Sequence, residues 1–364
     1  MQLKTFRNFD WWLFMSAYLL IFFGLSMMYS LAKSAFDMGL FYQHLANIGI
    51  GTAALLFLSG LSYHKTSLSS RFIYIVLVIL LIYLLVFTRE IRGSSRWIDF
   101  GFFNFQPAEF MKLILALVLG RLLWFARGSI NMPLKILQSL ALAGLPAALI
   151  ILQPDLGSSL ILLGCWISLL MISPMRKHYL IYFFIVSIIL CGLSWKFLLR
   201  DFQRHRIEVF LDPSLDPRGR GYNVSQAIIA VGSGGLTGKG LGEGYQSRLK
   251  FLPERQTDFI FATSAEEVGL IGSLIIISLY GIMLYRLRVI ALHAKDHLGY
   301  YTVCGFFFII TLEIAINVGM NIGILPVTGI PLPLFSYGGS AMLSTLMMLG
   351  VAQNVAFESK AFKY

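Results

Sequence analysis

Long apolar stretches dominate this chain, and they constrain its fold more than any other feature. A helix that crosses a lipid bilayer needs about 20 mostly apolar residues. Stretches close to this length occupy residues 10–32, 43–62, 71–88, 107–125, 134–153, 157–173, 178–199, 260–285, 298–322 and 339–357. Only 13% of the residues are charged, whereas soluble domains contain about 25%. The sequence therefore predicts an all-α, polytopic integral membrane protein, with about ten transmembrane helices in a single membrane domain spanning residues 1–364.

Basic residues between these stretches predict how the helices are oriented. Lys4 and Arg7 precede the first stretch, which is too long for a signal-peptide core and lacks a small-residue cleavage site, so we expect a retained helix. Along the chain, alternate connecting segments are rich in lysine and arginine, and the others are poor. Short basic segments remain in the cytoplasm. We therefore expect both termini to be cytoplasmic, and residues 200–259, between the seventh and eighth helices, to form an extracytoplasmic loop.

The formal net charge of +11 has the same origin. Basic residues that flank apolar spans set the orientation and contact anionic lipid head groups. A nucleic-acid-binding protein gathers its basic residues in a soluble domain or on one face, and the sequence predicts no such domain. The charge thus indicates a membrane as the partner and argues against nucleic acid.

Polar residues interrupt the apolar pattern in four places. The first group comprises Arg96 and, at the start of the fourth stretch, Glu109 and Lys112, which are three residues apart and can pair on one helical face. This pair is a structural ion pair, or the floor of a polar cavity in which Lys112 binds phosphate or keeps Glu109 ionised; the two interpretations are compatible. The second group is centred on Asp155, in the break between the fifth and sixth stretches. Asp155 is either a helix N-cap or part of a polar site at an interrupted membrane helix.

The third group ends the long loop and enters the eighth stretch. Its polar residues are Glu254, Arg255, Thr257 and Asp258, followed two turns later by Glu266 and Glu267. A carboxylate where water meets lipid can contact the head of a lipid-borne substrate, and ionisable residues at such depths are costly unless they have a function. Asp258 is either a helix cap or a general base. Glu266 and Glu267 are either a second functional pair or acids that suit a helix N-terminus.

The fourth group lies around the end of the ninth stretch. After Asn317 and Asn321 comes a run rich in proline and glycine, residues 326–340, whose hydroxyl-bearing members include Ser336, Tyr337 and Ser340. Irregular backbone at membrane depth is tolerated only where it is buried in protein or lines a polar cavity. This run is therefore either a re-entrant structural loop or a segment that offers hydroxyls and backbone amides to a substrate.

With the predicted orientation, all four groups lie at the external end of the helices. Their convergence predicts one extracytoplasmic cavity near the outer head groups. A glycine-rich segment, residues 232–244, lies in the long loop shortly before the third group. We expect it to be either a flexible cover over the cavity or an ordinary connection.

Together these motifs resemble the SEDS family, the polytopic peptidoglycan glycosyltransferases of shape, elongation, division and sporulation. The matching segments are residues 96–99, 105–112, 153–157, 252–262, 266–270 and 329–340. The Pro-Glu-Arg-x-Thr-Asp form of the third group is most similar to the rod-elongation members. One departure is Gln256, where the family often has a histidine; it removes any role for an imidazole there but leaves Asp258 in place.

The resemblance implies an enzyme that polymerises lipid II, the undecaprenyl-pyrophosphate-linked disaccharide pentapeptide. The reaction would take place at the outer face of the bacterial cytoplasmic membrane, for cell elongation and shape. Asp258 matches the family's essential aspartate, and we expect it to take the proton from the acceptor's 4-hydroxyl. The family usually works with a class B penicillin-binding protein, a transpeptidase that also activates it, so such a partner is implied.

Several basic residues are candidate pyrophosphate ligands, because guanidinium groups bind phosphate bidentately. They are Lys112, Arg96, Arg204, Arg218 and Arg255. A divalent cation, Mg²⁺ or Mn²⁺, held by Asp258 or Asp155 would share this task, although no ligand spacing indicates one. Three alternatives remain open: a lipid II flippase, since broken helices with intramembrane charges also suit a transporter, the division or sporulation member of the same family, and a structural scaffold.

Overall fold

The computed structural model describes residues 9–35, 38–87, 96–99, 104–126, 133–176, 179, 181, 204, 208–212, 215–216, 219–248 and 254–359. Helices account for most of them: α1 (Trp11–Ala35), α2 (Gly39–Gly60), α3 (Tyr63–Phe87), α4 (Pro107–Ala126), α5 (Pro133–Leu152), α6 (Leu156–Ile172), α9 (Arg220–Ser233), α10 (Tyr245–Arg248), α11 (Ile260–Leu292), α12 (His297–Asn321) and α13 (Gly339–Glu358). An antiparallel hairpin, β1 (Ile98–Asp99) and β2 (Asn104–Phe105), precedes α4.

The predicted all-α membrane fold is confirmed. Within the described ranges, α1, α2, α3, α5, α11, α12 and α13 are long and apolar enough to cross a membrane. The predicted spans 107–125 and 157–173 fall on α4 and α6; α6 is shorter, at 17 residues, and α4 carries charged residues near both ends. The predicted span 178–199 falls almost wholly outside the described residues.

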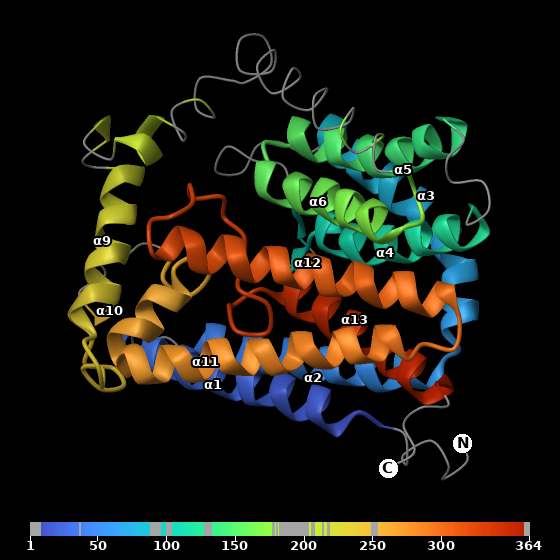
Figure 1. Cartoon of the computed structure of the whole chain (residues 1–364). Coiled ribbons are helices and arrows are strands. Elements are labelled where there is room, and N and C mark those ends of the chain that lie inside the picture. Colours follow the sequence, from blue (N-terminus) through green and yellow to red (C-terminus); the bar gives the residue numbers. More distant parts are fainter. Residues whose placement is uncertain are drawn as a thin grey trace.

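The helices pack around α12 and α13. Figure 1 shows α1, α2 and α11 on one side of this pair and α3 to α6 on the other, with α9 and α10 at one end of the bundle. α12 contacts α4, α6 and α11, and α13 contacts α2 and α4. α4 is buried on nearly all sides, and Met111, Leu115 and Leu117 are fully enclosed. A helix that is hydrophobic on nearly all sides packs inside a bundle. The charged residues near the start of α4 are therefore buried together with the rest of the helix.

A partly buried ion pair joins helix ends at the opposite end of the bundle from α10. Arg286, near the end of α11, contacts Asp10 with Nη2 to Oδ2 at 2.7 Å and Nε to both carboxylate oxygens at 3.0–3.1 Å. The Asp10 backbone exchanges two hydrogen bonds with the side chain of Gln353 on α13, at 3.0 and 2.9 Å. The start of α1 and the ends of α11 and α13 are thereby joined in one fully hydrogen-bonded cluster.

Candidate active site

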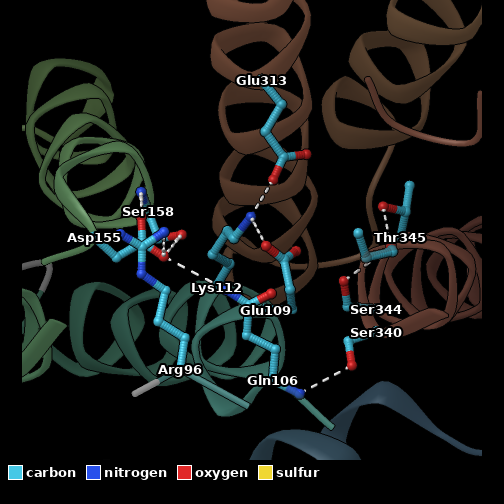
Figure 2. Close-up of polar contacts among 11 residues, drawn as sticks. Arg96, Gln106, Glu109, Lys112, Asp155, Ser158, Glu313, Ser340, Ser344 and Thr345 are labelled. Carbon is cyan, nitrogen blue, oxygen red and sulfur yellow. Dashed lines mark hydrogen bonds and ion pairs between the residues drawn. The ribbon is translucent and has the colours of Figure 1, made fainter. Parts of the chain in front are cut away.

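Three ionisable side chains meet inside the bundle near the start of α4 (Figure 2). Lys112 Nζ lies 2.8 Å from Glu109 Oε1 and 2.5 Å from Glu313 Oε1, which comes from α12. All three residues are buried, with exposures of 1%, 3% and 4%. The predicted pairing of Glu109 with Lys112 is confirmed. Glu313 was missed, although an acid in the middle of the apolar stretch 298–322 was a signal for it.

A second polar group forms where α5 ends and α6 begins. The Asp155 carboxylate accepts hydrogen bonds from the backbone N–H and the hydroxyl of Ser158 at 3.1 and 3.0 Å. Asp155 therefore caps α6, which was one of its two predicted roles. Arg96 Nη1 lies 3.7 Å from Asp155 Oδ2. The same guanidinium donates to the backbone oxygens of Gln153, at 3.2 Å, and Pro154. Arg96 therefore fastens the segment before β1 to this break.

Gln106 and Ser340 connect these groups to α13 (Figure 2). Gln106 Nε2 donates to Asp155 Oδ2 at 3.4 Å, and its backbone N–H donates to the Ser340 hydroxyl at 3.0 Å. That hydroxyl in turn donates to the Asn104 carbonyl at 2.8 Å. The hairpin, the α4 start, the α6 cap and the α13 start are therefore one hydrogen-bonded unit.

The turn formed by residues 254–259 carries Asp258 and leads into α11. The Asp258 N–H donates to the Glu254 carbonyl at 3.2 Å. Two amides of α12, from Asn317 and Asn321, donate to the Asp258 carbonyl oxygen at 3.1 and 3.0 Å. The backbone is thus held independently of the Asp258 carboxylate, which is partly exposed. The structure places Phe259 at the N-cap position of α11, so Asp258 lies one residue before the cap.

The segment 326–338 packs against this turn. Ser336 Oγ donates to the Thr257 carbonyl at 2.7 Å, and the Tyr337 N–H donates to the Gln256 carbonyl at 2.9 Å. The Tyr337 hydroxyl donates to Gln43 Oε1 on α2 at 2.6 Å. Both hydroxyls that we expected to face a substrate thus bind protein groups in this structure, which fits the alternative of a buried structural loop.

The same segment also contacts the carboxylate of Asp258 and the α6 start. A Cβ placed on Gly329 would lie 3.5 Å from Asp258 Oδ2, so the carboxylate lies over this glycine. A Cβ on Gly157 would lie 2.8 Å from Ile330 Cγ1 and 3.2 Å from the Thr328 carbonyl oxygen. The segment therefore touches the second and third groups directly, and Ser340 beyond it touches the first.

α12 links the ion triad to the Asp258 turn. Glu313, Asn317 and Asn321 are spaced four residues apart and so share one face of this helix. Glu313 binds Lys112, while the two asparagines hold Asp258. At a rise of 1.5 Å per residue, Glu313 lies about 12 Å before Asn321 along α12, so the triad is deeper in the bundle than the Asp258 turn. The four predicted groups thus lie at one end of the bundle. Their contacts extend from the Asp258 turn to the buried ion triad.

Arg255 is a predicted phosphate ligand of this network with an unused donor. It is buried, at 9% exposure, and its Nη1 has no hydrogen-bond partner among the described residues. Burial lowers the pKa of its guanidinium, and the Glu267 carboxylate partly offsets that effect. Lys112 and Arg96, by contrast, already contact carboxylates. Few residues are described around Arg204, and Arg218 lies outside the described residues.

Glu266 and Glu267 bind the glycine-rich segment and the end of α1. Glu266 Oε1 accepts from the Gln246 N–H at 2.9 Å and lies 3.5 Å from Lys239 Nζ. The Glu267 carboxylate accepts from the Ser30 hydroxyl at 3.1–3.2 Å. Both acids are buried, at 0% and 2% exposure. Both carboxylates bind protein groups in the interior, so these residues are more than acids that suit a helix N-terminus. The helix is interrupted just after them.

The glycine-rich segment is a strap on this interruption, in place of the flexible cover or plain connection we expected. Gly269 has φ 69° and ψ −166° inside α11. The backbone groups exposed by the break pair with the segment: Leu270 N–H donates to the Gly235 carbonyl at 2.9 Å, and Gly240 N–H donates to the Glu267 carbonyl at 3.0 Å. Because these are backbone hydrogen bonds, the strap and the broken helix hold each other in place.

We expect Gly269→Ala to destabilise the protein. The backbone conformation of Gly269 is open essentially to glycine alone, and strain there costs about 1–3 kcal/mol. A Cβ would also lie 2.3 Å from the Gly238 nitrogen. The matched control is Gly281→Ala in the same helix, where a Cβ meets nothing within 4 Å. Thermal unfolding in detergent should show a lower melting temperature for the first variant only; equal temperatures would contradict the strap.

The divalent cation that Asp258 or Asp155 would hold stays a prediction. No group of three or more histidine, cysteine, aspartate or glutamate side chains in the described ranges is arranged to hold a metal ion. The oxygens of Asp155 already accept from Ser158 and Gln106 and lie beside Arg96. We therefore derive no step through a cation.

Comparison with known proteins identifies the family. The family model for FtsW, RodA and SpoVE, described as "Cell cycle protein", matches residues 9–361. The chain belongs to this family. Its members similar to it include the peptidoglycan glycosyltransferase MrdB of Escherichia coli K12, 36% identical over 326 residues, covering 89% of this chain and 87% of the relative. Stage V sporulation protein E of Bacillus subtilis is 36% identical over 353 residues, covering 94% and 95%.

Two solved structures share the fold over nearly the whole chain. One is a chain from a structural study of how a peptidoglycan synthase complex coordinates polymerization and crosslinking. It superposes with a TM-score of 0.81 at 29% identity, covering 96% of this chain and 97% of that one. Rod shape determining protein RodA of Thermus thermophilus superposes with a TM-score of 0.72 at 26% identity, covering 97% and 98%. The suspected membership is therefore confirmed, and the protein is a multi-pass membrane protein.

Proposed function

We propose that this protein is a peptidoglycan glycosyltransferase that polymerises lipid II into glycan strands, in the service of cell elongation. Its relatives of the FtsW/RodA/SpoVE family bear that enzyme name. The observation that carries the proposal is the composition of the 254–259 turn. A partly exposed carboxylate, Asp258, and a buried guanidinium with a free donor, Arg255, lie three residues apart on a backbone that α12 fixes.

The two groups suit the two charge changes of glycosyl transfer. The acceptor's 4-hydroxyl oxygen attacks the anomeric carbon of the donor, and the bond from that carbon to the pyrophosphate oxygen breaks. Asp258 takes the hydroxyl proton, acting as a general base. Arg255 stabilises the negative charge that develops on the departing lipid pyrophosphate, since a preorganised donor in a dry site is most effective there. Fixing the turn through Asn317 and Asn321 keeps both groups in register with the substrates.

The buried triad serves this site as a positioning element. Lys112 is enclosed by Glu109 and Glu313, so it does not present a free charge to phosphate in this structure. It joins α4 to α12, the helix whose amides hold Asp258. We therefore assign Lys112 to holding α4 against α12 and Arg255 to the pyrophosphate.

The proposal extends to the partner and the membrane face. A related chain forms part of the study of a peptidoglycan synthase complex that coordinates polymerization and crosslinking. By analogy, a class B penicillin-binding protein assembles with this chain. The basic segments support cytoplasmic termini in a bacterial cell. In that orientation the Asp258 end of the bundle faces outward, and glycan strands emerge outside.

Reconstitution in liposomes distinguishes an enzyme from a transporter. Lipid II with a fluorescent label is placed in both leaflets, and two quantities are followed: glycan length on a gel and movement of label between leaflets. We expect glycan strands from the wild-type protein with its cognate transpeptidase. Transbilayer movement without any polymer would overturn the proposal in favour of a flippase.

A further inference from the structure

A groove lies on the outside of the bundle between α3, α4 and α5 (Figure 1 shows these helices packed together). Its volume is about 480 Å³, and its wall is mostly apolar, including Ile75, Val118, Leu122 and Leu145. The Tyr74 hydroxyl donates to the Leu142 carbonyl at 2.8 Å and joins α3 to α5 along the groove. Pockets that bind small ligands have volumes of roughly 300–1,000 Å³.

The groove lies toward the opposite end of the bundle from Asp258. α4 starts at the site, with Glu109 and Lys112, and reaches the groove only in its second half, at Val118 and Leu122. α5 runs the other way: Gln138 near its start lines the groove, and its end leads to Asp155. With the proposed orientation, the groove faces the cytoplasmic leaflet of the membrane, and it is distinct from the catalytic site.

Basic side chains lie at or near this groove. Arg71 lines it and is exposed. Arg121 is not a lining residue, but it directly precedes the lining residue Leu122, is partly buried and interacts electrostatically with Arg71. Nε of Arg121 is buried and lacks a hydrogen-bond partner in the described part of the chain. Within that part, neither arginine has a carboxylate partner. Lys135 adds a third charge, since its Nζ donates to Gln138 Oε1 at 3.2 Å.

We propose that this groove binds one anionic phospholipid, with an acyl chain along the apolar wall and the phosphate against Arg71 and Arg121. Like charges held close together repel, and an anion between them removes that cost. A zwitterionic lipid brings a positive group to the same place and gains less. Basic pockets between helices on the cytoplasmic side are suited to anionic head groups.

Native mass spectrometry of the purified full-length protein tests this. The protein is delipidated in detergent and offered equal amounts of phosphatidylglycerol and phosphatidylcholine with the same acyl chains. We expect the wild-type protein to retain one phosphatidylglycerol in preference to phosphatidylcholine. The double variant Arg71→Gln/Arg121→Gln should bind it roughly thirtyfold more weakly, since each basic residue near a head group contributes about 1 kcal/mol.

Two further variants separate the groove from general charge. Ala141→Phe fills the groove, so it should weaken phosphatidylglycerol binding while all cations remain. Arg288→Gln removes an exposed arginine near the end of α11 and should leave binding unchanged. Melting temperatures verify that each variant is folded. The proposal fails if the wild type shows no preference, or if Ala141→Phe or the double variant binds like the wild type. It also fails if Arg288→Gln weakens binding as much as the double variant. Displacement of the lipid by millimolar inorganic phosphate would indicate a phosphate site and would overturn the proposal as well.

Discussion

Replacing Asp258 by asparagine is expected to lower the rate of glycan polymerisation at least about a hundredfold, because a positioned general base contributes roughly 10²–10⁴ to a rate. The amide has nearly the same shape but cannot take the proton of the acceptor hydroxyl. The backbone of the turn is held by Asn317 and Asn321 through the Asp258 carbonyl oxygen, which the substitution keeps. The variant should therefore stay folded and still bind lipid II.

The measurement is the initial rate of polymer formation from purified lipid II, together with the melting temperature in detergent. Glu243→Gln is the control, since Glu243 is an exposed acid on the glycine-rich strap. Its rate should match that of the wild type. A slow but unstable Asp258→Asn variant would indicate a structural role, and a rate within a few-fold of wild type would remove Asp258 from the chemistry.

Lys112→Met is expected to cause the largest loss of stability. Removing the cation leaves the buried carboxylates of Glu109 and Glu313 facing one another, and breaking a buried ion pair in this way typically costs about 3–5 kcal/mol. The melting temperature in detergent should fall clearly. Lys65→Met, at an exposed position near the start of α3, should change stability by no more than about 0.5 kcal/mol.

A triple variant shows whether the effect comes from charge. Glu109→Gln/Lys112→Met/Glu313→Gln removes all three charges, and neutralising a whole buried cluster often restores stability. We expect its melting temperature to recover most of the difference. If Lys112→Met alone melts like the wild type, the three side chains do not form the buried triad described above.

Much of the fold could be predicted because lipid leaves few options. The backbone must satisfy its own hydrogen bonds inside a bilayer, so long apolar stretches become helices. Local chemistry was also predictable in part: the spacing of Glu109 and Lys112 predicts that they can pair, and a cap was one of the two roles predicted for Asp155. Each of these depends on residues that are close in the sequence.

Long-range partners were not predictable in the same way. Glu313 is 201 residues from Lys112, and only the packing of α12 on α4 brings them together. The apolar stretch 260–285 indicated a continuous helix, whereas Gly269 breaks it, because the strap supplies the backbone partners that the break exposes. The hydroxyls of Ser336 and Tyr337 looked available in the sequence, but they bind Thr257 and Gln43 across the fold.

The most direct test of the central claim asks whether this chain itself forms the glycosidic bond. The purified protein is combined with its cognate penicillin-binding protein, whose transpeptidase is blocked with penicillin, and given purified lipid II as the only substrate. We predict long glycan strands without crosslinks. The complex carrying Asp258→Asn should produce none above background. Strands of equal yield from both complexes, or none from the folded wild-type complex, would contradict the account.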